Sequence, residues 1–424
     1  MKPVVVIHVD SFRREYVSSW LLGQKFKQAG YRVILTSRTS TTYLFRVFTP
    51  DIVILSHVFT LSAAELTGLI TRDVKVYINE VEGVIDDEAC IASTYPAGYI
   101  NYELLAGIFV WSQWSRDWLI EYRNIDPQRV HAIGSIRNSV VIKRKESKSV
   151  LVVGILSRFE LINTFDGRHN FENLLAIDPE NEAMRWYYDR CAIDAEAFSI
   201  ISKMIGILTA KGIAVSLRPH PNENVSSYWL LKHKFGPLFS IDPSYDLTEW
   251  LSNVSVVMGP TSSAYTEAYL ARVPIVSTQG IQNCHYSGED RIKIISAFSQ
   301  AAYMPNTVND AIQLCVNPLL QPIDSAALNA YFESFYSISN KTDPINAIIS
   351  TVVSDAESYH LPERAVYRWL GPVLKYWIDV ASLCRAALTR NALMSLRNMK
   401  QYNFSAVLHR PSAYMRKIEG EKSI

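Results

Sequence analysis

A short segment at residues 217–224, Leu-Arg-Pro-His-Pro-Asn-Glu-Asn, holds a histidine between two prolines, with an arginine just before them. The segment follows a predicted strand, and ligands of open α/β sheets bind beyond the carboxyl ends of strands. The prolines fix φ on both sides of His220 and so restrict its imidazole. Because Arg218 and His220 together suit a phosphate or a carboxylate, this segment predicts an anion site. A purely structural turn is the alternative.

A second segment, residues 258–268, ends another predicted strand, turns at a Gly-Pro pair and opens a helix with Thr261, Ser262 and Ser263. Hydroxyls and backbone N–H groups at a helix N-terminus form an anion site. Glu267 follows early in the helix, where its carboxylate can hold ribose hydroxyls. Helix capping by the hydroxyls is the alternative explanation. Both segments follow strand ends in the same half of the chain, so we expect them to face one cleft.

A pair of carboxylates follows a predicted strand in the first half of the chain. The segment 77–83 reads Tyr-Ile-Asn-Glu-Val-Glu-Gly and places Glu80 and Glu82 beside Gly83. A carboxylate that reaches an acceptor hydroxyl and has a suitable pKa acts as a general base. The residues leave open whether Glu80 or Glu82 has this role, or whether both are solvated loop carboxylates.

Four further residues belong to the predicted site. Asp10, which follows the first strand, is either the N-cap of the first helix or a second acid. Arg13 and Arg14 come three and four positions after it, and Asn163 follows the first strand of the second half. Six aromatic residues are candidates for stacking on sugars, with packing in the core or at a domain interface as the alternative: Trp111, Trp114, Trp118, Trp186, Tyr187 and Tyr188.

The elements that must position these residues alternate between strand and helix, which predicts doubly wound parallel sheets. A basic, Ser-rich stretch at 143–149 is typical of a linker and divides two such series. The first series has strands at 4–9, 32–35, 51–55, 75–78 and 105–111 and helices at 17–29 and 113–122. The second has strands at 150–155, 214–217, 255–258 and 273–277 and helices at 194–211 and 261–271. We therefore predict domains at 1–145 and 148–345, followed by 346–424 as a crossover and tail.

Charge is distributed unevenly, although the formal net charge of the 424 residues is only +1. From residue 361 on there are 11 Lys and Arg against 4 Asp and Glu, whereas the rest has 31 against 37. This balance does not indicate nucleic-acid binding, but a basic tail favours an anionic partner. Apolar residues recur at helical spacing from 362 on, so we predict that 362–417 contacts the inner face of the cytoplasmic membrane. Packing as an ordinary capping helix is the alternative.

Other sequence signals are absent. The sequence has no GxGxxG, Walker A, GxSxG or HExxH motif, and its five cysteines include no CxxC pair. The Asp-Asp-Glu run at 86–88 is the nearest approach to a metal-binding motif. We expect a reaction that needs no metal and no cofactor besides the donor. With no signal peptide and no apolar run of about 18 residues, we expect a cytoplasmic protein.

Taken together, the three segments resemble the bacterial surface carbohydrate biosynthesis proteins. That family is similar to the GT-B enzymes of capsule synthesis that use CMP-sugars, the polysialyltransferases and β-Kdo capsule transferases. The resemblance covers roughly residues 4–290. The His-Pro element at 218–224 and the Ser/Thr element at 262–268 are intact. Departures from the family pattern are Val81 for an acid before Glu82, Ser112 for Gly after Trp111, and Ser139 for the Asp that follows Arg137.

The resemblance implies an α/β fold of the GT-B type, with two Rossmann-like domains that face a cleft. In the CMP-sugar enzymes the His-Pro and Ser/Thr elements bind the CMP phosphate and ribose, and the acidic-Gly element supplies the base. Carried over, it assigns Glu82 to catalysis, with Glu80 as the alternative, and His220 to the donor phosphate. The predicted donor-binding residues are Arg218, His220, Pro221, Asn224, Thr261, Ser262, Ser263 and Glu267, and the predicted acceptor or cleft residues are Asp10, Arg13, Arg14, Gly83 and Asn163.

The sequence thus predicts a glycosyltransferase that moves a Kdo- or sialic-like sugar from a CMP-activated donor to a growing surface polysaccharide or lipid-linked glycan. Three alternatives stay open. The first is a CDP-glycerol or CDP-ribitol phosphotransferase, and the second is a UDP-sugar transferase or epimerase-like enzyme of the same fold. The third is a membrane-bound scaffold without enzymatic activity. The phosphotransferase also releases CMP but does not consume CMP-ulosonates, the UDP-sugar enzyme releases UDP, and the scaffold binds no nucleotide.

Overall fold

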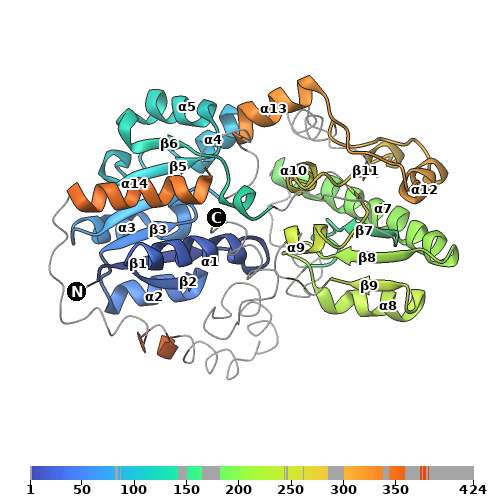
Figure 1. The fold of residues 1–424 in the computed structure, drawn as a ribbon, viewed down its shortest axis with the longest axis horizontal. Coiled ribbons are helices and arrows are strands. Elements are labelled where there is room, and N and C mark those ends of the chain that lie inside the picture. The colour runs from blue at the N-terminus through green and yellow to red at the C-terminus, as the bar shows by residue number, and fades with distance from the viewer. Residues whose placement is uncertain are drawn as a thin grey trace. The chain divides into compact units, whose positions relative to one another are not determined.

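The chain forms two compact units in a computed structural model (Figure 1). One unit comprises Met1–Val140 and Ala330–Ile424, and the other comprises Val141–Asn329. Each unit is described by itself. The structure describes residues 2–81, 85, 87–141, 150–164, 182–242, 244, 247–260, 262–284, 300–337, 343–358, 373–374, 376–378 and 381.

The first unit contains a six-stranded parallel sheet in the order β2-β1-β3-β4-β5-β6. From β1 the chain runs to β2 on one side and then crosses to β3 on the other. The topological switch point, where ligands bind in such sheets, therefore lies between β1 and β3. The strands are β1 (Val4–Val9), β2 (Arg32–Ser37), β3 (Ile52–Leu55), β4 (Lys75–Asn79), β5 (Gly107–Val110) and β6 (Val130–Ala132).

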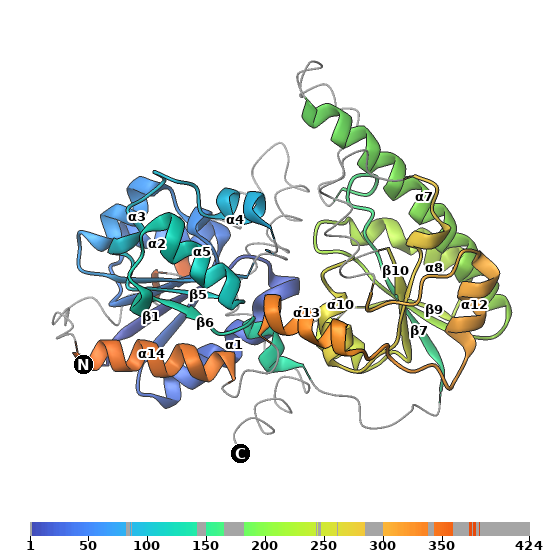
Figure 2. The same cartoon turned by 90° about the horizontal axis from the view of Figure 1, so that it is seen from above.

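Helices cover both faces of this sheet (Figure 2), as a buried parallel sheet requires. On one face α1 lies beside α14, and α1 packs so closely that a Cβ on Gly23 would be 3.2 Å from Val33. On the other face Leu44, Leu66 and Leu119 share one core with the strands. The helices are α1 (Phe12–Gln28), α2 (Arg38–Val47), α3 (Ala63–Ile70), α4 (Glu88–Thr94), α5 (Gln113–Arg123) and α14 (Pro344–Ser358), with short 3-10 turns η1 (Val58–Thr60), η2 (Tyr102–Leu104), η3 (Pro127–Arg129) and η4 (Ile136–Val140).

The second unit contains a five-stranded parallel sheet in the order β11-β10-β7-β8-β9. Its chain runs from β7 outward to β9 and then returns to β10 on the other side of β7. The switch point lies between β7 and β10. The strands are β7 (Val152–Leu156), β8 (Ala214–Arg218), β9 (Phe239–Ile241), β10 (Val256–Gly259) and β11 (Ile275–Ser277).

Helices also cover both faces of the second sheet. Met204 and Leu208 of α7 and Ile312 of α12 share a core with the strands. On the opposite face Trp250 of α9 packs against Gly154, where an added Cβ would be only 2.7 Å from the indole. The helices are α7 (Glu182–Ala210), α8 (Trp229–Phe235), α9 (Leu247–Leu251), α10 (Tyr265–Leu270) and α12 (Val308–Val316), with 3-10 turns η5 (Val225–Tyr228) and η6 (Gln279–Ile281). The next helix, α13 (Ala326–Tyr336), contains the boundary at residue 329 and leads the chain back into the first unit.

Several element bounds differ from those that the sequence predicts. The helix predicted at 17–29 begins at Phe12. The prediction missed its first turns, because they bury polar side chains such as Glu15 and lack the expected apolar spacing. The helix predicted at 194–211 begins at Glu182. The helix predicted at 261–271 begins only at Tyr265, and the strand predicted at 105–111 is shortened to Gly107–Val110.

The chain re-enters the first unit after residue 329. There α14 packs beside α1 and η4, and the Tyr336 ring lies 5.4 Å from that of Trp111. The predicted second domain, 148–345, extends past this boundary, because no composition change in the sequence marks the return. The predicted linker at 143–149 lies outside the described residues.

Only a few residues of the basic tail are described. Leu374 and Ile378 pack against the core of the first unit. On the same segment Val373, Tyr376 and Trp377 are exposed, Trp377 by 62%. The described part of the predicted tail thus has one packed side and one exposed aromatic side. Among the described residues, no helix has the length and apolar character needed to span a membrane.

Candidate functional site

The loops that follow β7, β8 and β10 leave three neighbouring strands at the carboxyl edge of the second sheet. Residues 157–164 follow β7, residues 219–224 follow β8 and residues 260–264 follow β10. Since β8 and β10 both pair with β7, the two predicted anion-binding segments flank one central loop. Their position at carboxyl strand ends is as the sequence predicts.

The His-Pro turn is held in place by a buried carboxylate. Glu223 is 2% exposed and accepts hydrogen bonds from the Ser157 hydroxyl and the Phe159 N–H. It also accepts from the Tyr228 hydroxyl at 2.6 Å and from the His220 N–H at 3.1 Å. Burial raises the pKa of Glu223, and the charge of His220 and these hydrogen bonds oppose the increase. The backbone of His220 is therefore anchored to the loop after β7.

The His220 ring is half-buried and lies against a second carboxylate. Its Nδ1 is 3.2 Å from Oε2 of Glu160 and 3.3 Å from the backbone N of Asn222. The Asn222 side-chain amide donates to the same Glu160 oxygen at 3.2 Å. Burial alone raises the pKa of Glu160, but the hydrogen bond and charge of His220, together with Arg190 and Arg158, hold it well below the ordinary value.

Arg218 has partners inside the protein. Its guanidinium, 7% exposed, forms an ion pair with Asp242. The same Nη1 donates to the backbone oxygen of Ser244 at 2.7 Å and to its hydroxyl at 2.9 Å. These contacts join the ends of β8 and β9. Donor binding by Arg218 stays a prediction.

Asn224 and Asn163 fasten the His-Pro turn to the loop after β7. The Asn224 N–H donates to the Asn163 oxygen at 3.0 Å, and the Asn163 side-chain amide donates to the Asn224 oxygen at 3.2 Å. The Asn224 carboxamide oxygen also caps η5 by accepting from Ser226 N–H. Both asparagines thus have a structural function. Direct contact of Asn224, Asn163 or Pro221 with a donor stays a prediction.

The second predicted segment forms a tight turn between β10 and α10. A Cβ on Gly259 would lie 2.4 Å from the Leu156 oxygen, so only glycine allows β10 to approach β7 here. The Tyr265 hydroxyl donates to the Gly259 oxygen at 2.9 Å. Ser262 and Ser263 are partly buried in the turn, and Ser262 Oγ accepts from the Ala264 N–H at 3.3 Å. Glu267 is 2% exposed, and Thr261 lies outside the described residues.

Arg158 connects the two segments electrostatically. It follows β7 directly, is partly exposed, and its charge lowers the pKa of Glu160, the partner of His220. The same charge opposes the increase that burial causes in the pKa of Tyr265, at the start of α10. Sequence reasoning missed Arg158 and Glu160 because they belong to no motif. Their position directly after the first strand of the second half is the signal that would have found them.

Of the two carboxylates predicted as the general base, only Glu80 lies among the described residues, and its side chain is buried in the first unit. Glu80 is 2% exposed and accepts from the Tyr95 hydroxyl at 2.9 Å. Its backbone oxygen accepts from the Trp111 indole at 2.7 Å. Burial, and then the charge of Glu80, raise the pKa of Tyr95 well above its ordinary value. Glu82 and Gly83 lie outside the described residues.

A buried polar cluster marks the switch point of the first unit. The Nε2 atom of His57, which follows β3, is 3.5 Å from Asp10 Oδ1, and Arg14 Nη2 is 3.4 Å from Asp10 Oδ2. Glu15 accepts from Arg14 Nε at 2.7 Å and from Asp10 N–H at 3.1 Å. The alternative that Asp10 is an N-cap is wrong. Ser11 is the N-cap residue of α1, and the Asp10 carboxylate faces Arg14 and His57.

Arg13 lies in the first turn of α1, between Asp10 and Arg14, and is partly buried. Sequence reasoning missed His57, since a single histidine after a strand carries no motif. Only the pairing of β1 with β3 brings it to Asp10. The cluster joins acids and bases, but nothing in it identifies a ligand.

The aromatic residues suggested for sugar stacking divide into packed and exposed groups. Trp111 and Trp118 are buried in the first unit, where the Arg137 and Arg123 guanidinium groups lie over their rings. Tyr188 on α7 is 54% exposed. The side chain of Trp186 lies outside the described part of the chain.

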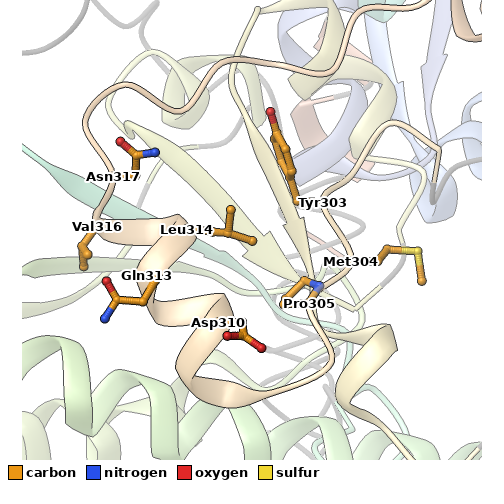
Figure 3. Close-up of a pocket in the computed structure, with 8 residues that line it drawn as sticks. All are labelled: Tyr303, Met304, Pro305, Asp310, Gln313, Leu314, Val316 and Asn317. Atoms are coloured by element: carbon orange, nitrogen blue, oxygen red, sulfur yellow. The ribbon is translucent and has the colours of Figure 1, made fainter.

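An open pocket of about 720 Å³ lies elsewhere in the second unit, between α12 and residues 303–305 (Figure 3). Its lining is largely uncharged, and none of the predicted site residues belongs to it. The only acid in the lining, Asp310, accepts a hydrogen bond from Thr307 at the start of α12. This lining does not suit a phosphate.

No protein-family model and no curated protein matches this chain. Among solved structures, the S. aureus MnaA–UDP co-structure is similar at TM-score 0.50 and 12% identity, over 85% of this chain and 98% of that one. A putative UDP-N-acetylglucosamine 2-epimerase from Listeria monocytogenes is similar at TM-score 0.48 and 12% identity, over 85% and 99%. The wall teichoic acid polymerase TagF is similar at TM-score 0.43 and 11% identity, over 84% and 90%.

At such identities the similarity concerns the fold. Both units contain a parallel sheet with helices on both faces, and each sheet has a switch point beside its first strand. The match to the MnaA structure covers 85% of this chain and so includes residues of both units. This chain therefore has the two-domain, Rossmann-like α/β architecture of GT-B proteins.

Proposed function

We propose that this protein is a metal-independent glycosyltransferase that uses a nucleotide-sugar donor. The donor is a CMP-activated, Kdo- or sialic-like sugar, and the acceptor is a growing surface polysaccharide or lipid-linked glycan of the capsule or lipopolysaccharide type. The observation that carries this proposal is the anchored His220 after the carboxyl end of β8, next to the central strand β7. Its ring lies against Glu160, in the loop after β7 that also carries Arg158.

In the proposed reaction, the donor-binding residues of the second unit act on the leaving group. When the bond between the sugar and the phosphate breaks, negative charge grows on the CMP phosphate. A donor N–H of His220, the charge of Arg158 and the hydroxyls of Ser262 and Ser263 stabilise that charge. Glu267 holds the ribose hydroxyls in this proposal. Because His220 is fixed by its backbone and by Glu160, little reorganisation is needed during transfer.

In the proposed reaction, the first unit supplies the general base. The proton of the acceptor hydroxyl moves to a carboxylate as the hydroxyl oxygen bonds to the anomeric carbon, and CMP leaves. Since Glu80 is buried and bound by Tyr95, we assign this role to Glu82. Asp10, Arg13, Arg14 and Gly83 line the acceptor side.

The tail at 362–417 brings the enzyme to the inner face of the cytoplasmic membrane, where lipid-linked acceptors lie. The exposed Tyr376 and Trp377 support this part of the proposal, since aromatic rings favour the interface. Vesicle flotation with anionic and with neutral lipid tests it. The protein is expected to float with anionic vesicles and to lose this binding when Tyr376 and Trp377 are changed to Ser.

Nucleotide binding tests the proposal as a whole. CMP, CDP, UDP, GDP and dTDP are compared by thermal shift, because a ligand at 100 times its Kd adds about 2.7 kcal/mol of stability. CMP is expected to give the largest shift. Glycerol or ribitol phosphotransfer from a CDP-linked donor also releases CMP, so consumption of a CMP-ulosonate, which only the proposed enzyme shows, separates these two activities. The largest shift with UDP would favour a UDP-sugar enzyme. No shift with any of the five contradicts the proposal.

Transfer assays then test the residues. His220→Ala and Glu82→Ala are expected to lose most transfer from CMP-sugar donors, since general-base catalysis contributes about 10²- to 10⁴-fold. His233→Ala, which changes an exposed histidine of the same unit, serves as the control. Near-normal rates for both site variants would overturn the assignment.

A further inference from the structure

We infer that Glu160 is a positioning residue, which accepts a hydrogen bond from Nδ1–H of His220 and so directs Nε2 of the doubly protonated ring, as Nε2–H, toward the donor phosphate. This inference rests on the proposed function and adds a residue that belongs to none of the predicted motifs. Glu160 itself does not touch the donor in this scheme. It acts through the imidazole.

Two groups compete for the same ring nitrogen. Nδ1 of His220 is 3.2 Å from the Glu160 carboxylate, which accepts a proton, and 3.3 Å from the Asn222 backbone N–H, which donates one. With a proton on Nδ1 the ring donates to Glu160. Without it the ring accepts from Asn222, and the proton of the neutral ring is on Nε2. The shorter, charge-assisted contact is the stronger one, so Glu160 selects the Nδ1–H form.

The carboxylate is kept ionised by buried cations. Arg190 on α7 is 4% exposed, and its Nη2 is 3.4 Å from Glu160 Oε1. Its Nε is 2.8 Å from Asp194, which in turn accepts from the Leu161 N–H at 3.1 Å. This network ties the loop after β7 to the long helix. His220, Arg190 and Arg158 together hold the pKa of Glu160 well below its usual range, despite its burial.

The functional consequence concerns the opposite ring nitrogen. When Nδ1 faces Glu160, Nε2 is the nitrogen left to face a ligand. A ring protonated on both nitrogens donates from Nε2 and carries a positive charge, as an anionic leaving group requires. Two carboxylates interact electrostatically with the His220 ring: Glu160, which contacts it, and the buried Glu223. Glu160→Gln removes the charge but keeps the shape, so the selection of the Nδ1 proton is lost.

The first experiment needs no nucleotide. Long-range ¹H–¹⁵N NMR of the full chain identifies the neutral tautomer of His220 at alkaline pH, and His220→Ala assigns the signal. The wild type is expected to show the Nδ1–H tautomer and Glu160→Gln the Nε2–H tautomer. Asp324→Asn removes a carboxylate from another ion pair of the same unit, with Arg272, and is expected to leave the tautomer unchanged. The same tautomer in wild type and Glu160→Gln overturns the inference.

The second experiment measures the consequence by calorimetry with CMP. Glu160→Gln is expected to weaken CMP binding about 10- to 100-fold, because the neutral Nε2–H ring of this variant keeps a hydrogen-bond donor but brings no positive charge to the phosphate. Glu160→Asp, which restores a carboxylate, recovers part of the affinity, and Asp324→Asn retains it. Equal affinity in Glu160→Gln and wild type contradicts the inference. If wild type binds no CMP, the proposed function fails, and the tautomer experiment alone decides the role of Glu160.

Discussion

At the scale of single residues, the site depends on two carboxylates with different tasks. Glu223 is buried and accepts from hydroxyls and N–H groups of three neighbouring segments, whereas Glu160 is partly exposed and pairs with the His220 side chain. Burial raises the pKa of the first, and cations lower that of the second. The first carboxylate holds the turn together, and for the second we propose a role at the site.

We expect Glu223→Ala to lower the free energy of unfolding by at least about 2 kcal/mol. The Tyr228 hydroxyl and the Phe159 N–H would lose their acceptor in a buried place, at roughly 1–3 kcal/mol each, whereas Ser157 and the His220 N–H keep a second acceptor. Urea unfolding monitored by circular dichroism measures the change. Glu121→Ala, at an exposed position on α5, is the control and should shift stability by less than about 0.5 kcal/mol. A small effect at 223 would mean that other contacts hold the turn.

A pH dependence follows from Glu160. Its pKa is lower in the folded chain than in the unfolded one, so its stabilising contribution is present above the ordinary carboxyl value of about 4.3 and is lost as the pH falls below it. The stability difference between wild type and Glu160→Gln is expected to shrink between pH 6 and pH 3.5. Urea unfolding at these two pH values measures it, and a constant difference contradicts the assignment.

At the scale of elements, the site requires strands that approach unusually closely. Gly259 ends β10 where a Cβ would touch the β7 backbone, and Gly154 within β7 leaves room for Trp250. Gly259 thus permits the close approach of β10 to β7, and Gly154 permits the packing of α9 on the sheet. The short α10 begins at Tyr265, and not at 261 as the sequence predicts.

We expect Gly259→Ala to cost at least about 1–3 kcal/mol, because the Leu156 oxygen is backbone and cannot move aside. Gly206→Ala on α7 is the matched control, since its Cβ would meet only Phe235 at 3.4 Å. Alanine is the better helix former, so this change should stabilise by up to about 1 kcal/mol. Denaturant midpoints of both variants measure the two effects, and equal midpoints would contradict the close approach.

At the scale of the whole molecule, the chain leaves the first unit and later returns to it. The second unit is one continuous segment with its own core, whereas the first needs α14 from beyond residue 329 to cover α1. Two Rossmann-like sheets arranged in this way form the architecture shared with the MnaA structure.

We expect the fragment 141–329 to fold alone and a fragment 1–140 not to. The fragment 141–329 keeps its five strands and the helices on both faces of the sheet. The fragment 1–140 exposes the face of α1 that α14 covers. Amide dispersion in two-dimensional NMR of each fragment distinguishes the outcomes. Adding residues 330–358 through a short linker should restore folding of the first unit. A well-dispersed spectrum from 1–140 alone would contradict this expectation.

The sequence by itself determined the strand–helix alternation, the two parallel sheets and the position of His220 and Ser262 at strand ends, because these follow from local apolar patterns and turn residues. Only the tertiary structure decided which groups meet them. The contacts of His220 with Glu160, of Glu223 with Ser157, and of Asp10 with His57 join residues from separate loops, brought together by strand order. The internal pairing of Arg218 and the sealing of Glu80 likewise depend on packing between distant segments, and local sequence carries no signal of it.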